Sequence, residues 1–298
     1  MNYLEEFLDF CQYQRSLSEN TVKGYRWDLK QYFGWLKDRG LEVITVKVRD
    51  IDSFIISQRK GGKAIKSVNR KISCLRAFYR WLLRIEAIER NPVELVQCVK
   101  GPKRLPKFLT QGQQEALIKA AGSTHRHSKW GDPHTPWEIW LETRDLLMIL
   151  LLLDTGVRIS ELCGIRRDDI DLEAGTIRII GKGDKERRAI LSDRCIALLR
   201  EALKIKLKGS DFLLVNSHTN CLGTRHAFRL VQDLGKRVGI PNLHPHMLRH
   251  SYATNLRRKG GDLLLIKEAL GHTSVSSTEI YAHLDEQEYT SKLRELIN

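Results

Sequence analysis

One break in an otherwise periodic sequence most constrains how this chain can fold. The stretch 91–110, NPVELVQCVKGPKRLPKFLT, holds three prolines and a glycine and shows little hydrophobic periodicity. Apolar residues recur at helical spacing on both sides of it, which predicts two separately folded units joined by a linker at residues 100–107. The 298 residues allow each unit a core of its own. The predicted domains are therefore 1–99 and 108–298.

The first unit is predicted to be helical throughout. Ser18 is a typical N-cap, and the residues that follow it keep one apolar helical face: Val22, Tyr25, Leu29, Phe33 and Leu36. A second helix is expected with Asp50 as its cap. A further helix over residues 64–85 places on one face Ile65, Val68, Ile72, Leu75, Phe78 and Leu82. We expect a small four-helix unit.

Positive charge is concentrated in this unit. The chain has 50 Lys and Arg against 36 Asp and Glu, and its net charge of +14 favours a polyanionic partner such as nucleic acid. No acidic residue lies between residues 52 and 86, a span with nine Lys and Arg. Solvated faces usually mix both signs. We therefore assign this face to DNA phosphates, with contacts from Lys63, Lys66 and Arg70.

The cysteines and the apolar runs indicate a cytoplasmic chain. Six cysteines form no C-x-x-C pair and mostly lie in apolar periodic stretches, so neither a disulfide framework nor a zinc site is expected. The start, MNYLEEFLDF, is acidic and amphipathic, unlike a signal peptide. The run LLMILLLL at 146–153 is too short to span a bilayer and predicts a core helix.

The second unit is predicted to be mainly helical with one patch of strands. Thr110 and Gln113 form a capping-box pattern that starts its first helix. Residues 169–192, DIDLEAGTIRIIGKGDKERRAILS, have β-branched runs around EAG and GKGD. These predict a three-stranded antiparallel sheet with a tight turn at 181–184. The fold class is mostly α, with a mixed α/β second domain.

Several polar residues of the second unit lie where a plain core does not explain them. They are Arg158 and Glu161 in DTGVRISEL, Lys182 in GKGDKER, His246 and Arg249 in HPHMLRHSYATNL, and His272 and Tyr281 in LGHTSVSSTEIYAH. The set contains no carboxylate cluster suited to a metal. We therefore expect no metal site and no cofactor.

The pair His272 and Tyr281 requires a break in the helix that precedes it. On one continuous helix their spacing would put them on opposite sides. Gly271 lies where a C-terminal glycine belongs, and Ser276 with Glu279 has the pattern of a new capping box. A helix that ends and restarts here lets both side chains turn inward.

Together these side chains suit phosphoryl transfer without a metal ion. Two guanidinium groups can hold the non-bridging oxygens of a phosphodiester and stabilise the charge that develops on them. Tyr281 can attack phosphorus and form a covalent phosphotyrosine. Lys182 suits the acid that protonates the leaving 5′ oxygen, and His246 suits the base that accepts the tyrosine proton.

In this order the motifs resemble the tyrosine recombinases, and TGVRISEL, GKGDKER, HMLRHSYAT and LGHTSVSSTEIYAH are most similar to the Xer branch. SENTVKGYRWDL also resembles the family's SAM-like N-terminal domain, which clamps DNA. The resemblance implies strand exchange through a Holliday junction, in a homo-tetramer on paired double-stranded sites or a hetero-tetramer with a second recombinase. It implies that Glu161 supports the active-site arginine and that His272 contacts the scissile phosphate. Lys185 and Arg187 on the hairpin are expected to touch DNA phosphates.

One segment departs from the family pattern. Residues 122–143, GSTHRHSKWGDPHTPWEIWLET, look longer than the usual connection and read as a surface loop. An alternative interpretation makes metal ligands of three histidines in this segment, His125, His127 and His134. We do not adopt it, because Gly and Pro interrupt the segment and its other residues are typical of a surface loop.

The leading function is an Xer recombinase that resolves chromosome or plasmid multimers. The runner-up is an integrase or transposase of a mobile element, which a neighbouring excision gene or attachment site would favour. A type IB topoisomerase would relax supercoils without site preference, and a silent DNA-binding protein would have no use for a nucleophile at Tyr281. The tail after Tyr281 is expected to form a short helix, which packs either on its own domain or on a neighbouring protomer.

Overall fold

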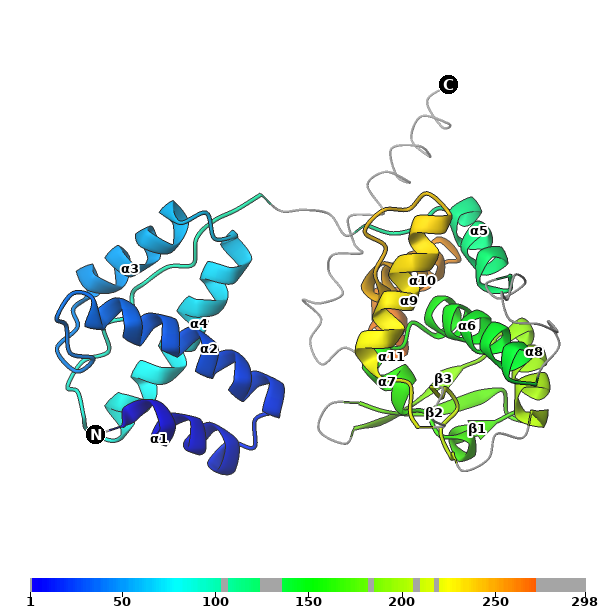
Figure 1. The fold of residues 1–298 in the computed structure, drawn as a ribbon, viewed down its shortest axis with the longest axis horizontal. Helices are drawn as coiled ribbons and strands as arrows, with labels where there is room; N and C mark the ends of the chain where they lie inside the picture. Colours follow the sequence, from blue (N-terminus) through cyan, green and yellow to red (C-terminus); the bar gives the residue numbers. More distant parts are fainter. Residues whose placement is uncertain are drawn as a thin grey trace, which may run out of the picture. The chain divides into compact units, whose positions relative to one another are not determined.

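The computed structural model describes residues 2–102, 107–123, 136–181, 185–205, 210–216 and 220–271. The chain divides into two compact units, Met1–Arg104 and Leu105–Asn298 (Figure 1). The division falls inside the linker predicted at residues 100–107. Each unit has its own hydrophobic core, so each is described by itself.

The N-terminal unit is helical, as its spacing predicts. Its helices are α1 (Tyr3–Asp9), continued by a π-helical segment (Phe10–Gln14), α2 (Glu19–Lys37), α3 (Val48–Lys60) and α4 (Ile65–Arg84). Ser18 is the N-cap of α2, which confirms that prediction. The cap predicted at Asp50 is wrong: α3 begins at Val48, and the Asp50 carboxylate accepts from the backbone N–H of Lys47 at 2.9 Å. Aspartate satisfies free N–H groups both at the cap and in the first turn, so sequence does not separate the two positions.

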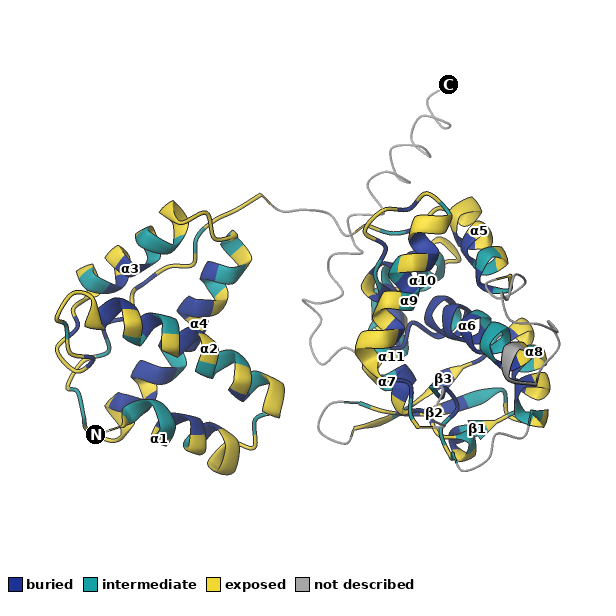
Figure 2. Cartoon of the chain, viewed as in Figure 1, coloured by how far each residue is buried: buried dark blue, intermediate teal, exposed yellow. Residues whose placement is uncertain are grey.

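Helix α4 forms the centre of this unit and packs against α2 and α3. One side of α4 is buried and the other is exposed (Figure 2). Two tyrosines bridge the core, because the hydroxyl oxygens of Tyr32 and Tyr79 lie 2.6 Å apart and Tyr79 also donates to the Val43 carbonyl at 3.1 Å. The hydroxyl groups of both tyrosines therefore have hydrogen-bond partners in the apolar interior.

The chain that leaves this unit is fixed to α4 before the linker begins. Asn69 on α4 donates to the Val99 carbonyl at 3.0 Å and accepts from the Val99 backbone N–H at 2.8 Å. Arg76, two turns further along α4, donates to the Val96 carbonyl. The backbone groups of Val96 and Val99 thus have side-chain partners on α4, although these residues form neither helix nor strand.

The C-terminal unit contains seven helices and three strands within its described residues. The helices are α5 (Gln111–Ala121), α6 (Pro136–Thr155), α7 (Ile159–Gly164), α8 (Asp193–Lys204), α9 (Thr224–Arg237), α10 (Pro245–Arg258) and α11 (Leu263–Leu270). A 3-10 turn (Arg167–Asp169) precedes the strands β1 (Ile170–Asp171), β2 (Thr176–Ile180) and β3 (Glu186–Ile190). Thr110 caps α5 in a capping box with Gln113, as predicted.

Helix α6 is the core helix that the apolar run 146–153 predicts. Its residues 147–153 are all buried, and it packs against α5, α8 and α10 (Figure 2). The loop prediction for residues 122–143 is wrong for the part from Pro136, where α6 begins. A proline suits the first turn of a helix, and Trp140 continues the buried face of the apolar run, with 1% of its surface exposed.

The sheet is three-stranded and antiparallel, in the order β1-β2-β3, which confirms the prediction. Ile170 pairs with Ile177, and Ile179 pairs with Arg187. Ile177 and Ile179 of β2 are buried in the core, so the side chains opposite them on β3 also face inward. This register turns Arg187 toward the interior of the unit. The turn that carries Lys182 lies outside the described residues.

Candidate active site

Arg158 is positioned by the end of the core helix. After α6, Gly156 adopts a φ of +60°, and a Cβ there would lie 2.3 Å from Cδ1 of Tyr252. Only glycine fits this turn, because a side chain would meet both backbone strain and the tyrosine ring. The chain then reverses into α7 with Arg158 at the N-cap position. The Arg158 side chain remains 38% exposed, so its guanidinium can reach a ligand.

Arg249 lies on the first turns of α10 and joins two helix ends. Its side chain donates through Nη1 to the Gly156 carbonyl at 2.5 Å and through Nη2 to the Leu270 carbonyl at 2.6 Å. Leu270 is the last residue of α11, and Gly271 after it has a φ of +64°, which confirms the predicted helix C-terminus. Carbonyl groups at helix C-termini carry partial negative charge, so they stabilise a buried guanidinium.

The Glu161 carboxylate is shared by two arginines. Arg158 donates to it twice, from Nη1 to Oε1 at 2.6 Å and from its backbone N–H to Oε2 at 3.0 Å. Arg187 of β3 donates from Nη2 to Oε2 at 2.9 Å. Burial lowers the pKa of Arg187, while the charge of Glu161 opposes this shift and that of Arg158 adds to it. Glu161 contacts Arg158, and the supporting role expected of Glu161 stays a prediction.

His246 lies one turn before Arg249 on α10, where its exposed ring lies 6.2 Å from that of His244 between centroids. Partial loss of solvent lowers the pKa of His246, and the charges of His244, Arg249 and Arg158 lower it further. An imidazole in this environment is neutral at pH 7, which is the form that accepts a proton.

His250 lies next to Arg249 and is half-buried. Burial lowers its pKa to about 4, with further lowering by the charges of His246, Arg249 and His244. It is therefore a neutral ring at pH 7. Sequence reasoning left this residue as a structural or DNA-backbone residue.

The arrangement suits one anionic group with several oxygens. Arg249 donates to the carbonyl of Gly156, two residues before Arg158, and both arginines influence His246. The structure thus brings Arg158 and Glu161 together with His246 and Arg249, from two separate parts of the sequence. Among the described residues, no group of three or more His, Cys, Asp or Glu could hold a metal ion.

The structure does not describe three of the predicted site residues, nor the histidines considered as alternative metal ligands. Lys182, His272 and Tyr281 lie outside the described residues, as do the three histidines of 124–135. Lys185 is described and exposed at the start of the hairpin strand. Roles for these residues remain predictions.

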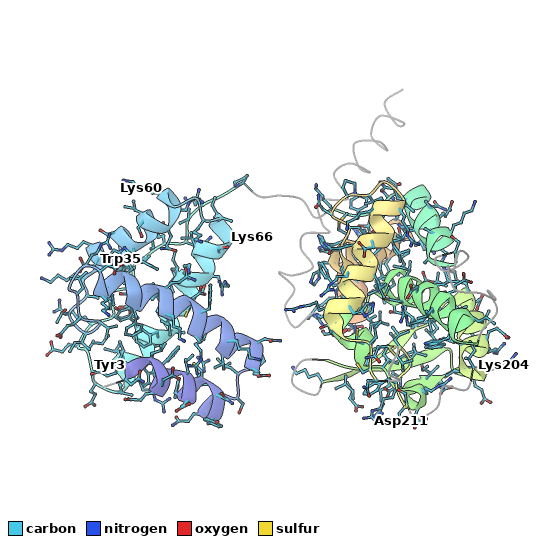
Figure 3. The ribbon with its side chains drawn as sticks, in the orientation of Figure 1. Tyr3, Trp35, Lys60, Lys66, Lys204 and Asp211 are labelled. Atoms are coloured by element: carbon cyan, nitrogen blue, oxygen red, sulfur yellow. The ribbon has the colours of Figure 1, made fainter. Side chains whose placement is uncertain are left out.

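The basic face of the N-terminal unit is exposed at the beginning of α4. Lys63, Lys66 and Arg70 all have exposed side chains, and Lys66 points away from the unit (Figure 3). Arg70 also forms an ion pair of 2.8 Å with Asp28 of α2, a carboxylate that sequence reasoning did not connect to this face. Contact between this face and DNA stays a prediction.

Sequence reasoning missed how Arg187 is placed. It assigned Arg187 to DNA phosphates on a hairpin surface, whereas the side chain is 16% exposed and faces Glu161. One signal was available: Arg187 and Ala189 share a face of β3, and Ala189 is apolar and buried. Nothing in the sequence indicated the partners of Arg249, because they are backbone carbonyls, which every residue has.

Two family models match the chain, one in each unit. The model of the phage integrase family matches residues 107–288, and that of the phage integrase N-terminal SAM-like domain matches residues 4–86. Within the described ranges, no helix is long and apolar enough to cross a membrane.

Curated relatives and solved structures extend over nearly the whole chain. The tyrosine recombinase XerD of Yersinia pestis is 32% identical, across 98% of this chain and 95% of its own. XerC of Thermodesulfovibrio yellowstonii is 33% identical, across 95% and 92%. The crystal structure of XerH bound to palindromic difH in a post-cleavage complex matches with a TM-score of 0.78 at 23% identity, over 99% of this chain and 85% of that one. The chain therefore belongs to the phage integrase family, as a tyrosine recombinase of the Xer type.

Proposed function

We propose that this recombinase cleaves and rejoins double-stranded DNA at a specific site through a 3′-phosphotyrosine at Tyr281. Strand exchange passes through a Holliday junction, and its biological outcome is the resolution of chromosome or plasmid multimers. The observation that carries the proposal is the convergence of Arg158, Arg249 and a neutral His246 in one part of the C-terminal unit. The structural relatives include XerH bound to its difH substrate before and after cleavage.

Each step of the reaction has a residue of suitable chemistry. The phenol oxygen of Tyr281 attacks phosphorus, and the bond from phosphorus to the 5′ oxygen breaks. His246 accepts the phenol proton, and Lys182 donates a proton to the leaving 5′ oxygen. Arg158 and Arg249, with His272, contact the non-bridging oxygens and stabilise their developing charge. A 5′ hydroxyl from a partner strand then attacks the phosphotyrosine and releases Tyr281.

The direct test is covalent trapping on a nicked suicide substrate that carries candidate sites. Wild type should form a protein–DNA adduct in EDTA, because no step needs a metal. Tyr281→Phe should abolish the adduct and leave DNA affinity nearly unchanged. Tyr252→Phe is the matched control, since Tyr252 is a described tyrosine beside Gly156 and should permit adduct formation.

Other outcomes would favour the other functions. Adduct from Tyr281→Phe at wild-type yield would remove the assigned nucleophile. Site-independent relaxation of supercoiled DNA by a monomer would indicate a type IB topoisomerase. Absence of an adduct, together with tight DNA binding, would indicate a silent DNA-binding protein.

Assembly into a tetramer on paired sites is part of the proposal. The tail after Tyr281 lies outside the described residues, and we propose that it docks on a neighbouring protomer. Truncation after Asp285 should leave single-site binding and circular dichroism intact while removing cooperative filling of paired sites. Gel-shift titration with one-site and two-site DNA measures this. Unchanged cooperativity and full recombination would exclude an exchanged tail.

A further inference from the structure

The buried Glu161 carboxylate has one arginine on each side, and the two arginines differ in access to solvent. Arg158, bound to Oε1, is 38% exposed, whereas Arg187, bound to Oε2, is 16% exposed. The Glu161 side chain itself is 5% exposed. A phosphate can therefore approach Arg158 from solvent, while Arg187 lies behind the carboxylate.

Arg187 is also covered by the end of α11. A Cβ at Gly271 would lie 2.7 Å from Nε and 2.8 Å from Cδ of Arg187, so the glycine backbone passes close to this side chain. Nε and Nη1 of Arg187 are buried and have no hydrogen-bond partner among the described residues. A DNA phosphate cannot reach these atoms without displacing the protein that covers them. Arg187 is thus poorly placed for the phosphate contact expected from sequence.

The charge of Arg187 matters to Arg158. A lone carboxylate paired with Arg158 would neutralise much of the positive charge that a phosphate should meet. The Arg187 guanidinium on the other oxygen offsets the negative charge of Glu161. Glu161 and its two arginines together therefore keep a net positive charge for the phosphate. Arg187 also fixes the plane of the carboxylate, which determines the direction of the Arg158 guanidinium.

We propose that Arg187 is a positioning residue for strand cleavage, which acts through Glu161 to orient Arg158 and preserve its charge toward the scissile phosphate. The inference rests on the proposed function and adds to it a residue that contacts no DNA. A misplaced catalytic group lowers the rate of the chemical step and leaves substrate binding largely intact. Loss of a phosphate contact would instead lower the affinity for DNA and the salt dependence of that affinity.

The test is single-turnover cleavage of the nicked suicide substrate at saturating protein, beside DNA affinity at several salt concentrations. Arg187→Met should slow cleavage about tenfold or more, with affinity and salt slope at wild-type values. Arg187→Lys should recover part of the rate, because it keeps a charge beside Glu161. Arg188→Met is the control, since Arg188 is the exposed neighbour on the opposite face of β3 and should cleave at the wild-type rate.

Two results would overturn the inference. One is wild-type cleavage by Arg187→Met. The other is an unchanged saturating rate with weaker binding and a salt slope reduced by about one, the signature of a phosphate contact. In a Glu161→Gln background, Arg187→Met should slow cleavage further by less than about twofold, since both act through one contact.

Thermal unfolding separates this inference from the proposed function. Failure of wild type to form an adduct would refute the proposed function alone, because the contact can still be measured by Tm. The Tm decrease caused by Arg187→Met should shrink in the Glu161→Gln background. Equal decreases in both backgrounds would show that the two side chains are independent, and would refute the positioning role even without cleavage data. If Arg187→Met does not fold, Arg187→Lys provides the same comparison.

Discussion

Replacing Asp28 with asparagine should destabilise the N-terminal unit selectively. Asp28 of α2 is 2% exposed, and its Oδ1 lies 3.2 Å from Nζ of Lys71, which is itself almost fully buried. Lys71 also donates to Gln31 at 2.8 Å, and Arg70 pairs with Oδ2 of Asp28 at 2.8 Å. One buried carboxylate therefore balances a buried ammonium and a half-exposed guanidinium.

The size of the effect follows from what remains after the substitution. At 3.2 Å and an effective dielectric constant of 20, the Asp28–Lys71 attraction is about 5 kcal/mol before desolvation is counted. Removing one partner of a buried pair costs about 3–5 kcal/mol, because the other charge stays buried. An asparagine carbonyl can still accept one hydrogen bond from Lys71, so we expect about 3 kcal/mol. The Asp28→Asn, Lys71→Met double variant should lose less than the sum of its single variants.

Hydrogen exchange followed by mass spectrometry on the full chain measures this loss where it occurs. Peptides from α2 and α4 should exchange faster in Asp28→Asn, while peptides from α6 and α10 keep wild-type rates and act as internal controls. Unchanged protection of α2 and α4 would show that the buried pair contributes nothing to stability. Additive losses in the double variant would show that the two residues are not coupled.

Three further predictions address the site and its surroundings. Arg249→Ala should lower single-turnover cleavage about a hundredfold or more, as for loss of a preorganised donor, and cleavage within a fewfold of wild type would contradict that role. Joint replacement of Lys63, Lys66 and Arg70 by glutamine should weaken binding to all duplexes and reduce the salt slope by up to about one per lost phosphate contact; wild-type affinity and slope would mean a merely solvated face. The pKa of His250 is lowered from 6.5 to about 4, so folding favours its neutral form. The free energy of unfolding should therefore be highest above about pH 6.5 and should fall by about 3 kcal/mol as the pH drops to 4. Denaturant unfolding of His250→Gln should show a smaller loss between pH 7 and pH 4.5, and an equal loss would assign the effect to other groups.

The features that could be predicted from the sequence depend on neighbours in the chain. Hydrophobic spacing predicted α2 and α4, and the caps at Ser18 and Thr110 followed from local hydrogen bonding. Alternating β-branched residues predicted the sheet. The motifs around Arg158 and Arg249 indicated an anion site because each has an unusual local setting, with a glycine turn before one and a helix start before the other.

The features that could not be predicted depend on contacts between distant segments. Arg187 pairs with a carboxylate 26 residues earlier in the chain, and Arg249 donates to a carbonyl 93 residues earlier. Asp28 and Lys71 are 43 residues apart, and neither spacing nor charge pattern links them. The helical residues after Pro136 were missed because Gly and Pro punctuation dominates the sequence just before them.

The way Arg249 is held bears on how far relatives of this chain can diverge. Two of its partners, at Gly156 and Leu270, are main-chain carbonyls, so the identity of the side chain at position 270 does not decide whether that hydrogen bond forms. What must persist is the place at which α6 and α11 each end. Insertions or deletions inside either helix would rotate its last carbonyl away from the guanidinium, whereas substitutions along it would not. Relatives should therefore keep the glycine at position 156 and the lengths of the two helices, while they tolerate exchange of residue types along the helices themselves.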